Sequence, residues 1–299
     1  MTLDPQAKWV LDIAEEKGLP SLDELTPEEA KTAYEERALT LTYKNVDIGK
    51  TIDLDIPGPL GEVPIRIYHP VGMTESLPVL VYYHGGGWVV GSRNTHDGLC
   101  RLIANSGPFI VVSVDYRMGP EHPFPAGPDD CIAVARELIA EGPLALGGDS
   151  AGGTLALTTL ADLLADGTPP ERVVLVSPAV DLDPSRPTPD IRGEMIFPLA
   201  LLHRVARDYV GCADPRNPRV SPIHAVFDNS PPVLIQCATG EVLEADTDAI
   251  AEHLVRAGVS VEVQKTDGVP HVWQLFVGRT PKADSAVDAM AAFLRGGTA

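Results

Sequence analysis

One short stretch limits the possible fold more than any other: the run Leu-Gly-Gly-Asp-Ser-Ala-Gly-Gly at residues 146–153. The apolar residues before it suit a short buried strand, and residues 154–165 after it are typical of a helix. Ser150 therefore falls at a strand-to-helix turn between Gly148 and Gly152, where larger side chains would collide. The pattern predicts a nucleophile elbow with a serine hydroxyl at a helix N-terminus. The alternative is a glycine-rich connection with an incidental serine.

Strand-like and helix-like segments alternate along most of the chain. Continuous apolar runs, typical of strands buried on both faces, occupy residues 78–83, 108–114, 172–176 and 233–237. Residues 46–56, 63–68 and 259–263 are also expected to be strands, and helical stretches lie between the later segments. The alternation predicts an α/β protein, with a mostly parallel central sheet flanked by helices.

Two segments do not fit this alternation and are expected to form a cap. Residues 1–45 are helical in character, and Thr26, Pro27 and Glu29 form a helix-start signal. The gap between residues 176 and 233 is too long for one crossover and holds an amphipathic helix near residues 199–209. We predict an N-terminal helical cap (1–45), a core (46–180 and 223–299) and a cap insertion after the sixth strand (181–222). The insertion could instead be a surface excursion with no role in binding.

Composition excludes several classes of function. A net charge of −19 over 299 residues argues against nucleic-acid binding, which needs a basic surface. No apolar run reaches the roughly 20 residues of a membrane helix, and the first residues lack the layout of a signal peptide, so we expect a cytoplasmic protein without stable membrane association. The four cysteines show no metal-binding spacing and no dinucleotide glycine pattern is present, so we expect neither metal nor cofactor.

A serine nucleophile needs donors for the oxyanion, a base and an orienting acid. The donors are expected in a glycine loop, His-Gly-Gly-Gly-Trp at residues 84–88, directly after a predicted strand. Consecutive glycines let the backbone approach a reacting carbonyl and aim N–H groups at it. The predicted oxyanion hole is two of Gly85, Gly86 and Gly87, together with the N–H of Ala151.

The order of residues along the chain identifies the base and the acid. In proteins with a nucleophile elbow of this kind, the serine comes first, the acid second and the histidine last. Of the histidines after Ser150, His271 lies in a loop that follows the last strand, whereas the others fall in helices or before a strand. We therefore predict His271 as the base. Glu241 follows the strand at residues 233–237 and is the predicted acid. Asp246 is the alternative acid, although it is also expected to cap the next helix.

The sequence resembles the hormone-sensitive-lipase-like family of α/β-hydrolase carboxylesterases. The matching motifs are the glycine loop at 84–88, Asp-Tyr-Arg at 115–117, Pro-Glu-His-Pro-Phe-Pro-Ala at 120–126 and Gly-Asp-Ser-Ala-Gly-Gly at 148–153. The resemblance covers nearly the whole chain and implies Ser150 as nucleophile and His271 as base. Two departures stand out: Glu241 occupies the place of the family's usual aspartate, and Trp273 that of a usual phenylalanine.

The expected activity is a serine carboxylesterase that hydrolyses short- to medium-chain acyl esters through a Ser-His-Glu triad and an acyl-enzyme. A small-molecule ester is the expected partner, and a homodimer is possible. The alternatives are an amidase or deacetylase with the same triad, or a non-catalytic ligand-binding member of the fold. His84 and Asp149, within the motifs, are expected to be structural. The predicted substrate pocket, which ordinary packing would explain equally well, comprises Trp88, Met195, Phe197 and Leu202.

Overall fold

The structure, a computed structural model, describes residues 4, 8–9, 21–42, 46–72, 77–186 and 199–296. Its helices and strands follow one another in this order: η1 (Leu22–Glu24), α2 (Pro27–Leu41), β1 (Lys50–Gly58), β2 (Gly61–His69), β3 (Val79–Tyr83), α3 (Asp97–Ser106), β4 (Ile110–Val114), α4 (Ala126–Glu141), β5 (Leu144–Asp149), α5 (Ala151–Ala165), β6 (Val173–Val176), α6 (Leu199–Val210), η2 (Pro222–His224), β7 (Val233–Ala238), α7 (Glu244–Arg256), β8 (Val261–Thr266), η3 (Trp273–Phe276) and α8 (Pro281–Leu294).

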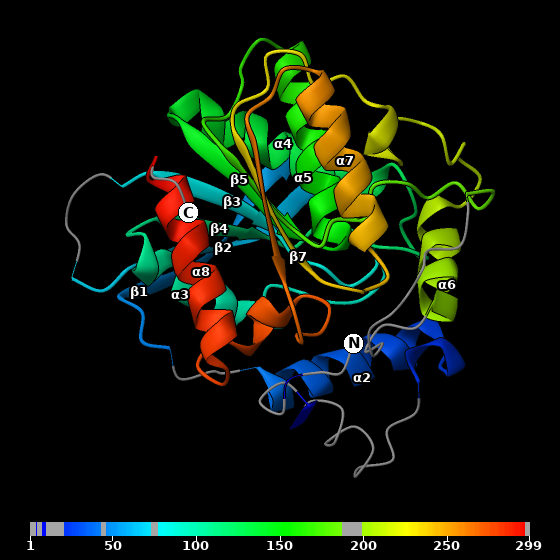
Figure 1. Cartoon of the computed structure of the whole chain (residues 1–299), viewed down its shortest axis with the longest axis horizontal. Helices are drawn as coiled ribbons and strands as arrows, with labels where there is room; N and C mark the ends of the chain where they lie inside the picture. Colours follow the sequence, from blue (N-terminus) through cyan, green and yellow to red (C-terminus); the bar gives the residue numbers. More distant parts are fainter. Residues whose placement is uncertain are drawn as a thin grey trace.

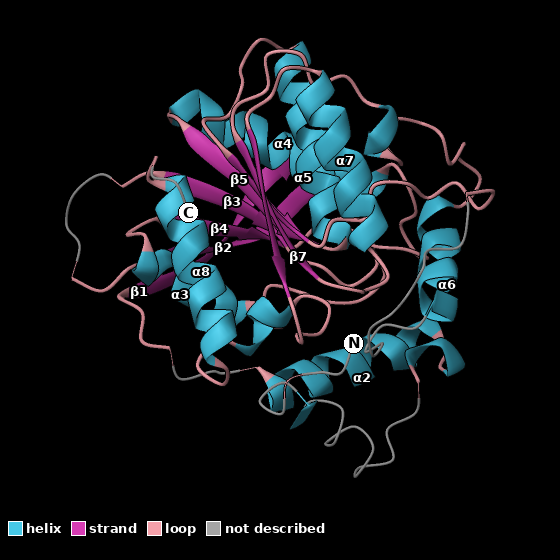
Figure 2. Ribbon diagram, viewed as in Figure 1, coloured by secondary structure: helices cyan, strands magenta, loops and turns pink. Residues whose placement is uncertain are grey.

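The strands form one eight-stranded sheet in the order β1-β2-β4-β3-β5-β6-β7-β8 (Figure 2). β1 pairs with β2, and β2 with β4, in antiparallel fashion, whereas all pairs from β4 to β8 are parallel. Every residue of β5, β6 and β7 is buried, as continuous apolar runs predict for central strands. The predicted α/β architecture is confirmed.

Helices cover both faces of the sheet (Figure 1). On one face, α4, α5 and α7 pack through side chains such as Leu155 and Ile250. On the other, α3 and α8 pack through Leu99, Ile103 and Met290. Leu99 and Ile103 are four residues apart and therefore project from the same side of α3. The two apolar layers hold the sheet rigid, so that the loops at its carboxyl edge have a fixed base.

Helix α2, from the N-terminal segment, and helix α6, from the insertion, lie next to each other beyond the sheet (Figure 1). Helix α2 begins with the predicted capping box, in which Thr26 Oγ1 accepts from the Glu29 N–H and the Glu29 carboxylate accepts from the Thr26 N–H. Arg204, on α6, donates to the carbonyls of Leu22 (3.0 Å) and Asp23 (2.9 Å) in η1. One guanidinium thus ties the two segments together. Their division into cap and core remains a prediction.

The strand boundaries differ by one to four residues from those predicted, most clearly in β1 and β8. β1 begins at Lys50, four residues later than the alternation indicated, and its pairing with β2 ends at Gly58 and Gly61. β8 begins at Val261 and continues to Thr266. It is an edge strand with one neighbour, so its polar second half can remain in the sheet while half-exposed.

The insertion helix was predicted near residues 199–209, and α6 occupies that place. Within the described residues, none of the helices has the length and apolar character needed to cross a bilayer.

Candidate active site

Ser150 occupies the turn between β5 and α5, with φ +52° and ψ −116°. This left-handed φ is unusual for a serine and indicates backbone strain. A side chain at Gly148 would clash with the Gly152 carbonyl, and one at Gly152 with the Tyr83 carbonyl. The Ser150 N–H donates to the Val176 carbonyl at 2.8 Å, which fixes the turn to β6. The geometry is that of the predicted elbow.

Ser150 lies directly before the first residue of a long helix, α5. α5 runs for 15 residues from Ala151 and has no acidic residue in its first turn. Its N-terminus therefore carries free N–H groups and a partial positive charge beside the serine, and its first turn holds no carboxylate that would reduce them. The residue is buried, with 7% of its surface exposed. A negative charge that develops next to Ser150 would be stabilised there.

The glycine loop follows β3 and lies against the elbow. Gly86 and Gly87 have φ values of +120° and +60°, which favour glycine. The Gly85 N–H is directed at the buried ring of His96, 3.3 Å from Nε2. Among the described residues, none accepts a hydrogen bond from the N–H groups of Gly86, Gly87 or Ala151. Of the three glycines predicted to supply oxyanion donors, the structure thus favours Gly86 and Gly87.

His84 and Asp149 are buried behind the glycine loop and the Ser150 turn and have structural contacts there, as the sequence predicted. His84 is fully buried; its ring stacks on Tyr116 with centroids 4.4 Å apart, and its Nδ1–H donates to the Gly85 carbonyl at 2.7 Å. Burial, followed by the nearby His96, lowers the pKa of His84 to about 4, so the ring is neutral at pH 7. The Asp149 carboxylate accepts from the Tyr82 hydroxyl at 2.9 Å and lies 3.1 Å from His96 Nε2.

Glu241 and His271 are in direct contact. Glu241 lies in the turn between β7 and α7, and His271 in the loop after β8. The Nδ1 atom of His271 is within hydrogen-bond distance of Glu241 Oε2. Burial is the largest influence on the pKa of the Glu241 carboxyl and raises it, but His271, with hydrogen bonds from its ring, Ser177 and Cys237, outweighs burial and holds this pKa below its usual value. Glu241 is therefore ionised at neutral pH and can orient the imidazole.

Asp246, the alternative acid, has a different set of partners. Its carboxylate accepts from the Val180 N–H at 2.8 Å and pairs with Arg186 at 2.6 Å. The expectation that Asp246 caps the next helix is wrong, because α7 begins at Glu244 with Leu243 at the N-cap position. Asp246 lies within the first turn and instead fixes the chain after β6. Of the two candidate acids, it is Glu241 that contacts His271.

Two residues near this pair were not found from the sequence. Ser177 and Cys237 both direct a donor at Glu241 Oε1, and both are buried. Cys237 ends the predicted strand and Ser177 follows another, so each lies at the carboxyl edge of the sheet where ligand sites of open parallel sheets form. That placement was the one available signal, although it does not reveal which polar residue faces the acid.

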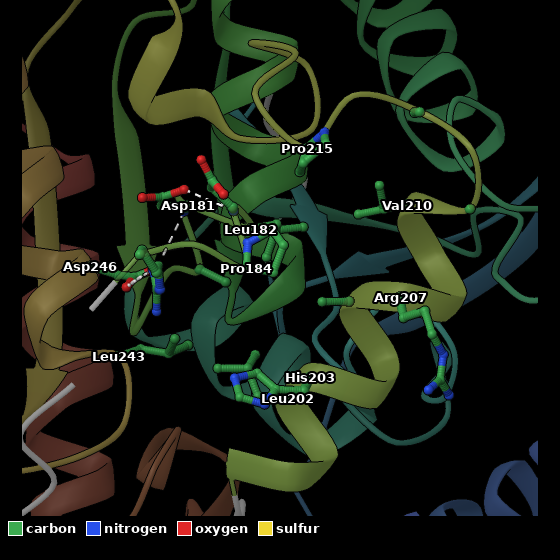
Figure 3. A pocket seen from close by; sticks show the side chains of 16 residues that line it. Asp181, Leu182, Pro184, Leu202, His203, Arg207, Val210, Pro215, Leu243 and Asp246 are labelled. Carbon is green, nitrogen blue, oxygen red and sulfur yellow. Dashed lines mark hydrogen bonds and ion pairs between the residues drawn. The ribbon is translucent and has the colours of Figure 1, made fainter. Parts of the chain in front are cut away.

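A cavity of about 570 Å³ lies between the chain after β6, helix α6 and the start of α7 (Figure 3). Leu182, from the chain after β6, Leu202, from α6, and Leu243, from the turn before α7, contribute apolar walls, and Asp246 with its partner Arg186 contributes a polar one. The predicted pocket residue Leu202 is thus placed at a cavity. The volume falls within the range of small-molecule sites.

The other predicted pocket residues are placed differently. Trp88 is buried beneath α6, where its ring stacks on Tyr209 with centroids 4.7 Å apart, and the lining of the cavity does not include it. This placement favours the packing interpretation for Trp88. Met195 and Phe197 lie outside the described residues.

Comparison with known proteins agrees with this geometry. Residues 80–275 match the model of a family described as having the alpha/beta hydrolase fold. An acetyl-hydrolase of Streptomyces hygroscopicus is 36% identical over 73% of this chain and 76% of its own length. The carboxylic ester hydrolase LipN of Mycobacterium tuberculosis is 32% identical over 98% of this chain and 84% of its own. A crystal structure of an esterase from the bacterial hormone-sensitive lipase family superposes with a TM-score of 0.85 at 31% identity, over all of both chains.

The resemblance inferred from the motifs is therefore confirmed, over the elbow, the glycine loop and the sheet that carries them. The match extends beyond these two turns to the full length of a solved esterase. The chain is a carboxylic ester hydrolase of the hormone-sensitive-lipase-like family, with the α/β-hydrolase fold.

Proposed function

We propose that this protein is a serine carboxylesterase that hydrolyses short- to medium-chain acyl esters through Ser150, His271 and Glu241. The observation that carries the proposal is the contact between Glu241 and His271 at the sheet edge where the strained Ser150 turn also lies. Ester hydrolysis by relatives such as LipN supports the reaction class. The cavity of about 570 Å³ is of a size that suits a small ester.

In the proposed mechanism, Ser150 Oγ attacks the ester carbonyl and its proton passes to His271. Because Nδ1 of His271 faces Glu241, Nε2 is the nitrogen that takes the proton. Glu241 fixes this tautomer and stabilises the imidazolium. The N–H groups of Gly86, Gly87 and Ala151 hold the oxyanion. His271 then protonates the departing alcohol, and water hydrolyses the acyl-enzyme by the same steps in reverse.

The test is hydrolysis of p-nitrophenyl esters of increasing acyl length by the purified protein and by Ser150→Ala. We expect turnover to be greatest with short to medium chains and to be lost in the variant, which would also fail to react with a fluorophosphonate. Retained activity in Ser150→Ala would refute the proposal. Matched anilides in the same panel separate an esterase from an amidase. The cytoplasmic location and the homodimer stay predictions.

A further inference from the structure

We propose that Ser177 is a positioning residue, whose hydroxyl fixes one oxygen of the Glu241 carboxylate so that the other oxygen faces His271. This inference rests on the proposed triad and adds a residue to it. Ser177 follows β6 directly and is fully buried. Its N–H donates to the Gln236 carbonyl of β7 at 2.7 Å, which fixes its backbone beside the strand that leads to Glu241.

The two oxygens of Glu241 have separate partners. Oε1 accepts from the Ser177 hydroxyl at 2.5 Å, from the Ala238 N–H at 3.0 Å and from the Cys237 thiol at 3.1 Å. Oε2 contacts His271 Nδ1. With three donors on one oxygen, the carboxylate cannot rotate about its terminal bond without losing all of them. The division therefore presents Oε2 to the imidazole in a single orientation.

Two of these three donors are side chains, and the Ser177 hydroxyl is a stronger donor than the Cys237 thiol. A thiol is a weak donor, and the Ala238 N–H belongs to a backbone that a side-chain substitution leaves in place. Hydrogen bonds from hydroxyls to ionised carboxylates are short and about twice as strong as neutral ones. The backbone of Ser177 also has a left-handed φ of +44°, which is uncommon for a serine. Strained residues of this kind gather at functional sites, and here the strain places a hydroxyl on the acid.

A glutamate needs this support more than an aspartate would. Its side chain has one more rotatable bond, so an unrestrained carboxylate samples more positions and orients the imidazole for less of the time. Without the Ser177 hydroxyl, the substrate would bind as before, because the hydroxyl faces Glu241 and lies outside the lining of the cavity. Proton transfer to and from His271 would slow. The expected signature is a lower kcat with an unchanged KM.

The experiment is a double-mutant cycle between Ser177 and Glu241, measured as kcat and KM on p-nitrophenyl butyrate. Ser177→Ala should lower kcat about tenfold with KM within twofold, as expected for one hydrogen bond to a charged group. Ser177→Gly should lower kcat by a similar factor. Because glycine adopts a positive φ readily, this variant replaces Ser177→Ala in the test if the alanine variant folds poorly. In the background of Glu241→Gln, Ser177→Ala should change kcat by less than twofold.

Ser113→Ala is the matched control, because Ser113 is a buried serine of β4 that, within the part of the chain that the structure describes, makes no hydrogen bond to Glu241 or His271. It should leave kcat within twofold of wild type. Equal losses from Ser177→Ala in both backgrounds would show a general structural role and overturn the inference. So would an unchanged kcat in Ser177→Ala and Ser177→Gly while Glu241→Gln is slow. If Glu241→Gln itself retains full kcat, the proposed triad fails, and this inference fails with it.

Discussion

Asparagine in place of Asp149 is expected to destabilise the protein by removing a charge from a buried pair. Asp149 ends β5, is 1% exposed, and faces the Tyr82 hydroxyl and the His96 ring. Burial acts most strongly on the pKa of its carboxyl and raises it, but His96 and the hydrogen bonds from His96 and Tyr82 together bring it below its usual value. The folded protein therefore favours the ionised form.

The expected loss in the free energy of unfolding depends on which hydrogen bonds of Asp149 an asparagine can still make. Its amide oxygen can still accept from Tyr82, whereas His96 loses its charged partner. Breaking a buried pair by removing one partner costs 3–5 kcal/mol in general, so we expect about 3 kcal/mol here. For a chain of this size, that corresponds to a decrease in Tm of about 6 °C, at roughly 2 °C per kcal/mol.

The pH dependence has a definite sign. Because the folded pKa of Asp149 lies below its unfolded value of about 4, the carboxylate contributes stability above that pH and loses it as the pH falls further. The gap between wild type and Asp149→Asn should be constant near neutral pH and narrow below about pH 4.

The assay is urea unfolding and thermal melting at pH 7, with unfolding repeated at successively lower pH. Asp248→Asn is the control, since Asp248 pairs with Lys265 at the surface and its side chain is 55% exposed. Exposed pairs contribute about 0–1 kcal/mol, so this variant should melt close to wild type. A loss below about 1 kcal/mol in Asp149→Asn, or a gap that widens in acid, would refute the reasoning.

Two further substitutions probe the loop and the cavity. Gly87→Ala should lower kcat on p-nitrophenyl acetate about 10²–10³-fold, because a Cβ there would lie 2.7 Å from the Val205 side chain and the residue has φ +60°, so the loop and its donors must move. Gly167→Ala, with φ +74° and open space around it, is the control and should keep its kcat; equal activity of the two variants would contradict the assignment. Leu202→Ala should shift the preferred acyl chain in an ester series by one to two carbons toward longer chains, since it enlarges the cavity; an unchanged profile would show that acyl chains bind elsewhere.

Features encoded within a few neighbouring residues could be predicted from the sequence. The capping box of α2 was found from Thr26 and Glu29, and the turn at Ser150 from its flanking glycines. Both depend on local backbone geometry that few residue types satisfy. The end of β8 was missed because an edge strand tolerates polar residues that resemble a loop.

Contacts between residues distant in sequence were harder to predict. Glu241 and His271 were paired from the order of elements along the chain, and the structure brings them into contact, whereas their catalytic roles stay predictions. The role of Ser177 was not visible, since 64 positions separate it from Glu241 and nothing around it sets it apart from other serines that follow strands. Asp246 was misread for the same reason: its partners Val180 and Arg186 lie some 60 residues earlier.

The close packing of Gly87 against Val205 has a consequence for engineering the enzyme. Val205 belongs to α6, the same helix that supplies Leu202 to the cavity, while Gly87 belongs to the loop proposed to stabilise the transition state. A mutant library on α6 designed to broaden substrate choice would therefore also disturb the loop on which turnover depends. Substitutions at Val205, which contacts Gly87 and is not part of the cavity lining, would act on turnover, whereas substitutions at Leu202, which lines the cavity, would act on the choice of substrate.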